Sequence, residues 1–145
     1  MDDLITWLRA QLDEDERVAR EAGGAAWSVG TEETPDGENA YYSIGAYGEE
    51  PFVDTDVTER AKFDHIVYWD PARVLREVEA KRAIIDMHQP DTQFSSDQQF
   101  CRKCATGDSC DDCLDYSTQV WPCSTLRLLA LPYSDHPGYE ESWRP

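Results

Sequence analysis

The sequence has few basic side chains and no long hydrophobic run. Thirteen Lys and Arg residues stand against 30 Asp and Glu residues among 145, which gives a formal net charge of −17. This balance argues against direct nucleic-acid binding, because such binding needs Lys and Arg to neutralise phosphates. Charged residues interrupt every apolar stretch, so we expect no helix that spans a membrane.

The first residues do not have the pattern of an export signal. Asp2 and Asp3 follow Met1, where a secretory signal would carry positive charge. We therefore expect a cytoplasmic protein, in a compartment where glutathione and thioredoxin keep thiols reduced. The number of cysteines is odd, five, and this also fits poorly with a closed set of disulfides.

Catalytic signatures are scarce as well. The sequence has no H-E-x-x-H motif, no nucleophile elbow and no glycine-rich phosphate loop. Its three histidines, His65, His88 and His136, stand apart from one another, and such histidines are more often surface residues than catalytic ones. The sequence predicts no catalytic residue and favours a non-enzymatic role.

The acidic residues are concentrated in one stretch, since no Lys or Arg occurs between Glu21 and Glu59. This stretch is either a solvated surface or a binding surface for a basic protein partner. The acidic residues that would form the binding surface are Glu32, Glu33, Asp36, Glu38, Glu49, Glu50, Asp54 and Asp56. Such a surface can imitate the phosphates of a nucleic acid and compete for a protein that binds one.

Five cysteines in one short segment are the most specific chemical signal in the sequence. They are Cys101 and Cys104, Cys110 and Cys113, which form two C-x-x-C pairs, and Cys123. This spacing lets two thiolates on one tight turn reach the same tetrahedral metal ion. The sequence therefore predicts a closed, structural zinc site that uses four of the five cysteines, with His88 as a weaker candidate ligand.

The alternative is a small thiol-redox protein or a metalloenzyme that uses the same cysteines. Thioredoxin-like chemistry places C-x-x-C at the junction of a strand and a helix, whereas polar loop residues flank both pairs here. Nearby acidic residues, among them Asp108, Asp111 and Asp112, would disfavour the reactive thiolate form. The sequence thus favours a bound metal over redox catalysis.

Hydrophobic periodicity predicts an α+β fold, in which a small antiparallel sheet packs against about three helices in one domain. The expected ranges are 3–22 for a helix, 26–54 for the sheet, 58–88 for further helices, 101–123 for a zinc-knuckle-like segment, and 124–145 for a C-terminal helix and tail. The first helix is indicated by Leu4, Leu8 and Leu12, and Gly23-Gly24 is typical of its end.

Residues 58–88 divide into two predicted helices at Asp70-Pro71. Asp70 is a typical N-cap, and Pro71 suits the first helical position, where its missing N–H has no consequence. In the shorter helix before this boundary, Ile66, Val67 and Trp69 are candidate core residues.

Aromatic residues gather in and around the predicted sheet. They are Trp27, Tyr41, Tyr42, Tyr47, Phe52, Tyr68 and Trp69. They could line a ligand groove, although such residues more often pack a small sheet against helices.

Three segments, residues 3–16, 70–82 and 123–137, together resemble a family of small proteins found in actinobacteria and their phages, known as domain of unknown function 6221. The resemblance spans nearly the whole chain and implies one compact domain, but it implies no activity. With the acidic stretch, the phage association favours a phage-encoded regulator or inhibitor that acts on a protein partner.

Overall fold

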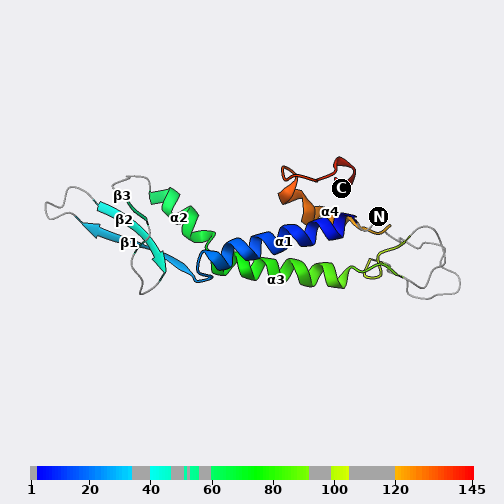
Figure 1. Ribbon diagram of the computed structural model, residues 1–145, viewed down its shortest axis with the longest axis horizontal. Helices are drawn as coiled ribbons and strands as arrows, with labels where there is room; N and C mark the ends of the chain where they lie inside the picture. The colour runs from blue at the N-terminus through cyan, green and yellow to red at the C-terminus, as the bar shows by residue number, and fades with distance from the viewer. Residues whose placement is uncertain are drawn as a thin grey trace. The chain divides into compact units, whose positions relative to one another are not determined.

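The computed structural model describes residues 3–33, 40–46, 51, 53–55, 60–91, 99–104 and 120–145. Its α+β class confirms the prediction (Figure 1). In chain order the elements are α1 (Asp3–Glu21), β1 (Trp27–Glu33), β2 (Ala40–Ala46), β3 (Val53–Thr55), α2 (Arg60–Tyr68), α3 (Pro71–Met87), α4 (Ser124–Ala130) and the 3-10 helices η1 (Leu131–Tyr133) and η2 (Glu141–Trp143).

By its internal contacts the chain divides into two compact units. Unit 1 comprises Met1–Asp13 and Glu79–Pro145, and unit 2 comprises Glu14–Val78. The expectation of a single domain stays a prediction. No helix in the described part of the chain is both long and apolar enough to cross a membrane.

Helix α1 forms because leucines recur at every fourth position along it. Leu4, Leu8 and Leu12 are buried, as expected for an apolar stripe on one helix face. The helix ends where Gly23 and Gly24 adopt positive φ angles of 98° and 65°. Their N–H groups donate to carbonyl oxygens in the last turn, each at 3.0 Å, an arrangement that favours glycine.

Unit 2 contains a three-stranded antiparallel sheet with the order β1-β2-β3. Strand β1 pairs with β2 along its whole length, from Trp27 opposite Ala46 to the far end of the hairpin. Ile44 lies at the centre of β2, opposite Val53 of β3, and is fully buried. Helix α2 packs against β1 and β2 and contributes the buried ring of Phe63.

The predicted core residues near α2 are largely wrong. Ile66 is 44% exposed and Trp69 is 45% exposed, while Val67 is only half-buried. This nine-residue helix has one narrow face for the sheet, and Phe63 and Val67, four residues apart, share that face. Trp69 lies beyond the last helical residue and therefore does not follow the helical pattern.

Unit 1 has a core of aliphatic side chains from several segments. Leu4 and Leu8 of α1, Ile85 of α3, and Leu126 and Ala130 of α4 are all buried in it. Ion pairs cross between the same parts of α1 and α3, from Arg9 to Asp86 and from Arg82 to Asp13. These exposed pairs add little stability, so the apolar contacts hold the two helices.

The residues after α4 pack on the first turns of α1 through Trp7. The indole N–H of Trp7 donates to the carbonyl oxygen of Pro137 at 3.0 Å. The centres of the Trp7 and Trp143 rings are 5.2 Å apart. Gly138 has a φ of 85°, and a Cβ there would lie 3.1 Å from the indole nitrogen. Glycine is therefore required where the chain passes this close to the ring.

Asp70 joins the start of α3 to the start of β1 within unit 2. One carboxylate oxygen accepts a hydrogen bond from the Arg73 backbone N–H at 2.7 Å, which makes Asp70 the N-cap. The other oxygen accepts from the Trp27 backbone N–H at 3.3 Å. The residue is only 9% exposed, so both hydrogen bonds are shielded from water.

We predict that Asp70→Ala lowers the free energy of unfolding by about 2 kcal/mol, because it removes the helix cap and the hydrogen bond that Asp70 accepts from the Trp27 N–H. Asp70→Ser is the matched control, since serine can still cap the helix and should cost only about half as much. Urea unfolding followed by tryptophan fluorescence measures both. Equal stability of Asp70→Ala and the unmodified protein would contradict the role assigned to Asp70.

Candidate metal centre

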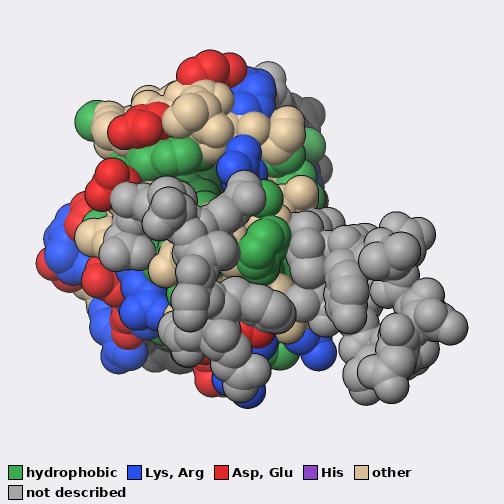
Figure 2. Space-filling model, turned by 90° about the vertical axis from the view of Figure 1, so that its right-hand side faces the viewer, with side chains coloured by type: hydrophobic (Ala, Val, Ile, Leu, Met, Phe, Trp, Pro, Cys, Tyr) green, Lys and Arg blue, Asp and Glu red, His purple; other side chains and the backbone are tan. Residues whose placement is uncertain are grey.

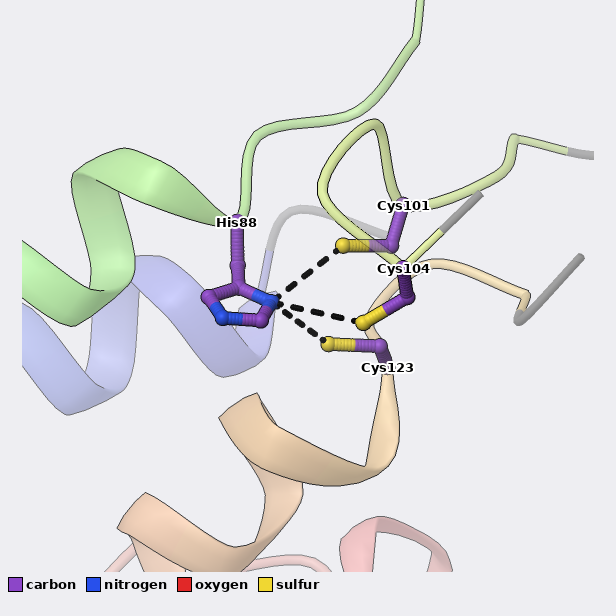
Figure 3. Close-up of side chains that lie close together, drawn as sticks. All are labelled: His88, Cys101, Cys104 and Cys123. Atoms are coloured by element: carbon purple, nitrogen blue, oxygen red, sulfur yellow. Dashed lines mark hydrogen bonds between the residues drawn. The ribbon is translucent and has the colours of Figure 1, made fainter. Parts of the chain in front are cut away.

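Three thiols and one imidazole meet at a single point in unit 1. The residues are His88, Cys101, Cys104 and Cys123, and one ligand atom from each lies within 4.8 Å of the others. Figure 3 shows the three sulfur atoms directed at the same edge of the imidazole ring. The side chains come from distant positions in the sequence, so the fold itself assembles the group.

Three different segments supply the ligands. His88 directly follows the last residue of α3, and its N–H still donates to the carbonyl oxygen of Ile84 at 3.2 Å, in the helical pattern. Cys101 and Cys104 lie on one turn, which is the knuckle expected from the C-x-x-C spacing. Cys123 is the N-cap residue of α4, with extended backbone.

Backbone pairing brings the turn back to the end of α3. Pro90 and Cys101 form an antiparallel bridge, and the N–H of Arg102 donates to the carbonyl oxygen of Gln89 at 3.0 Å. The side-chain amide of Gln89 in turn donates to the carbonyl oxygen of Ile85 at 2.8 Å. These bonds fix the knuckle against the residue that follows His88.

Trp121 fixes the third segment from inside the core. Its indole N–H donates to the carbonyl oxygen of His88 at 2.9 Å, and its backbone N–H donates to the carbonyl oxygen of Gln99 at 2.8 Å. The side chain is only 4% exposed. Trp121 therefore sets the distance between His88 and Cys123, two residues further along.

The distances fit coordination better than hydrogen bonding. Atom Nδ1 of His88 lies 3.4 Å from Sγ of Cys101, 3.5 Å from Sγ of Cys104 and 3.4 Å from Sγ of Cys123. One ring nitrogen carries at most one proton, so it cannot make three hydrogen bonds as a donor. Around a tetrahedral zinc ion, bond lengths of about 2.3 Å to sulfur and about 2.0 Å to nitrogen place these atoms about 3.5 Å apart.

A bound cation would also stabilise neighbouring thiolates in this group. Burial, together with hydrogen bonds to the other two thiols, raises the pKa of Cys104 to about 12. Burial also opposes ionisation of Cys123, but the backbone amide of Leu126 and the neighbouring thiols outweigh it and hold the pKa of Cys123 below its usual value. Neighbouring thiolates repel one another, and a bound divalent cation removes that repulsion.

The cluster is shielded from water and reduced. Cys101 and Cys123 are almost fully buried, Cys104 and His88 are half-buried, and the three cysteines are free thiols. Four donors of this type complete a tetrahedral shell, which leaves no open position for a substrate. The group could therefore hold a metal ion in a closed shell.

The structure thus brings three of the predicted cysteines together, and His88, the weaker candidate, joins them. Cys110 and Cys113 lie outside the described residues. The useful signal for His88 was its place at the end of a helix, followed by Pro90, which turns the chain back. Sequence reasoning gave more weight to the second C-x-x-C pair.

The eight acidic residues proposed for partner binding are mostly outside the described part of the chain. Glu32 and Glu33 lie in β1, and Asp54 lies in β3. The five that fall outside it are Asp36, Glu38, Glu49, Glu50 and Asp56. Their role as a binding surface stays a prediction.

The chain belongs to a family of unknown function, DUF6221, whose model matches residues 1–145. This match confirms the resemblance found in the sequence. No curated protein and no solved structure matches the chain. A functional proposal therefore rests on the cluster and on the charge of the chain.

We predict that Co²⁺ bound to the purified protein gives the strong thiolate-to-metal absorption of a tetrahedral site. Cys101→Ser and Cys123→Ser should weaken this absorption, because each removes a sulfur ligand. Cys110→Ser and Cys113→Ser are matched controls and should leave it unchanged. If a control variant loses the absorption and Cys123→Ser keeps it, the assigned ligand set is wrong.

Proposed function

We propose that this protein is a non-enzymatic, zinc-stabilised acidic accessory protein that binds a protein partner. The observation that carries the proposal is the convergence of three thiol sulfurs on one imidazole nitrogen. A closed site of this type supports folding rather than catalysis. The partner-binding part rests on the charge of the chain.

Zinc is the metal that this donor set favours. Thiolate and imidazole together select zinc over the hard cations magnesium and calcium, which prefer oxygen ligands. Zinc also needs no redox chemistry and accepts a tetrahedral shell readily. Bound here, it would link the end of α3, the knuckle and the start of α4, three segments of unit 1.

The net charge of the sequence, −17, supports a basic partner and argues against direct nucleic-acid binding. On the face seen in Figure 2, acidic and basic side chains of described residues lie beside one another. Arg17 pairs with Glu14 and Glu21, and Arg20 pairs with Glu16. These pairs offset part of the negative charge of α1, and most of the negative excess of unit 2 comes from residues further along the chain.

A basic strip on α3 would favour nucleic-acid binding, but three of its four cations have partners within the protein, and only Arg76 is exposed without a partner among the described residues. In unit 2, Arg73 donates to Glu77 at 2.9 Å. In unit 1, Arg82 pairs with Asp13, and the Lys81 amine lies 3.2 Å from the Tyr133 hydroxyl. These cations are held by the fold rather than presented to phosphates.

The second candidate is a thiol-redox protein or metalloenzyme built on the same cluster, and the presence of three free thiols within one group favours it. Cys101→Ser separates the two. A structural metal predicts loss of folding in unit 1, whereas redox work predicts a folded protein with lower thiol reactivity.

We predict that protein purified without added metal carries one equivalent of zinc and that a chelator destabilises it. When the free zinc concentration is a thousand times the dissociation constant of the zinc–protein complex, binding raises the free energy of unfolding by about 4 kcal/mol. Metal analysis and urea unfolding with and without chelator measure the two quantities. Well under one equivalent of zinc, with unfolding that ignores the chelator, would remove the zinc proposal.

We also predict that the immobilised protein retains basic proteins from a bacterial lysate at low salt. High salt should release them, because the Debye length falls to about 3 Å at 1 M. The double variant Glu32→Gln/Glu33→Gln should retain less. Retention that is equally strong at high salt, or no retention at all, would speak against a partner bound by charge.

A further inference from the structure

Unit 2 has an apolar groove between the end of α1, the start of β1 and the start of α3. Its volume is about 270 Å³, and its walls include Val18, Ala22, Trp27, Trp69 and Val74. Pockets for drug-sized ligands are about 300–1,000 Å³, so this groove suits one or two aliphatic side chains. Of the aromatic residues that could line a groove, Trp27 and Trp69 do line this one.

Two of these walls expose apolar surface that the fold leaves uncovered. Val18 is 50% exposed and Trp69 is 45% exposed, and both face the same hollow. Single exposed apolar residues are ordinary, but exposed apolar residues that line one hollow mark interaction sites. Tryptophan is also the residue type most enriched among energetically dominant contacts.

Trp69 is held in position before any partner binds. The guanidinium of Arg73 lies 4.0 Å from the centre of the Trp69 ring and equally close to the centre of the Tyr68 ring. Arg73 is itself fixed by Glu77 at 2.9 Å. A side chain that is already ordered loses little entropy on binding, which favours affinity.

One acidic side chain and one helix end bring negative charge to the groove. Asp15 forms part of its wall, and unit 2 has 16 acidic residues against six basic ones. Ala22, another wall residue, follows the last turn of α1, where the partial negative charge of the helix dipole favours cations. Positive charge on an incoming segment would therefore be attracted to Asp15 and to the end of α1.

We propose that this groove binds an amphipathic segment of a basic protein, with an aliphatic side chain between Val18 and Trp69 and flanking Lys or Arg side chains over the acidic surroundings. The proposal rests on the proposed function and names the chemistry of the partner. Charge complementarity favours this occupant. A second copy of the same chain carries a net charge of −17 and would be repelled, as would an anionic lipid surface.

The test uses a labelled peptide in which leucines recur at helical spacing among lysines, titrated with the full-length protein. One control peptide replaces every leucine with serine, and another replaces every lysine with glutamate. Fluorescence anisotropy should show the leucine–lysine peptide binding at least about tenfold more tightly than either control, a difference of about 1.4 kcal/mol. Equal binding of the leucine and serine peptides overturns the proposal.

Two variants localise the binding to the groove. Val18→Ser and Trp69→Ala should each weaken the leucine–lysine peptide about tenfold. Leu128→Ser is the matched control, because Leu128 of α4 is 55% exposed and does not line the groove. If Val18→Ser and Leu128→Ser behave alike, the groove is not the site. Sedimentation that shows a dimer dissolved by Val18→Ser would instead identify a second copy as the occupant.

The same samples separate this proposal from the proposed function. Metal content is measured on every variant, so a protein that holds zinc but ignores the peptide overturns the groove alone. A protein that binds the peptide but holds no zinc overturns the zinc proposal alone. Retention of basic proteins that survives Val18→Ser and is lost in Glu32→Gln/Glu33→Gln places binding on the strands and overturns the groove.

Discussion

In unit 1 three sulfur atoms approach one imidazole nitrogen, and the proposed function depends on this group holding a metal ion. Its ligands lie on the end of α3, on a four-residue turn and at the cap of α4, and none of these segments is part of a sheet of regular strands. Small folds of this kind often need a metal because their cores bury too little apolar surface. Trp121, bonded to the carbonyl of His88, keeps the ligands in place from the core side.

The negative charge of the chain is offset to different extents in the two units. In unit 1 a divalent cation would offset thiolates at the cluster, and ion pairs such as Arg9 with Asp86 offset carboxylates. In unit 2 the acidic residues outnumber the basic ones by a wider margin, and several of the arginines are committed to local partners. By sequence, unit 2 therefore carries the larger net negative charge, which is the basis of the proposal that a basic partner binds there.

Much of the fold follows from local sequence. Leucine spacing predicted α1, the Gly23-Gly24 pair predicted where it ends, and Asp70-Pro71 predicted the start of α3. Each of these signals acts within a few residues. Ile66 and Trp69 were misjudged because a short helix offers the sheet a single narrow face, and the position of that sheet is a tertiary property. At the candidate site, Cys101 and Cys104 were indicated by the C-x-x-C spacing, and Cys123 by its place in the same cysteine-rich segment.

His88 ranked too low for a related reason. It is 13 residues before Cys101 and 35 before Cys123, and nothing in that spacing shows that the chain returns. The return depends on the Pro90–Cys101 bridge and on the indole of Trp121, which are contacts between distant residues. Counting thiols alone favoured an all-cysteine site, whereas the geometry includes an imidazole.

X-ray absorption at the zinc edge of protein purified without added metal tests the central claim most directly. The account predicts about three sulfur neighbours at about 2.3 Å and one nitrogen neighbour at about 2.0 Å. Four sulfur neighbours, a shell of oxygen and nitrogen alone, or the absence of zinc would contradict it.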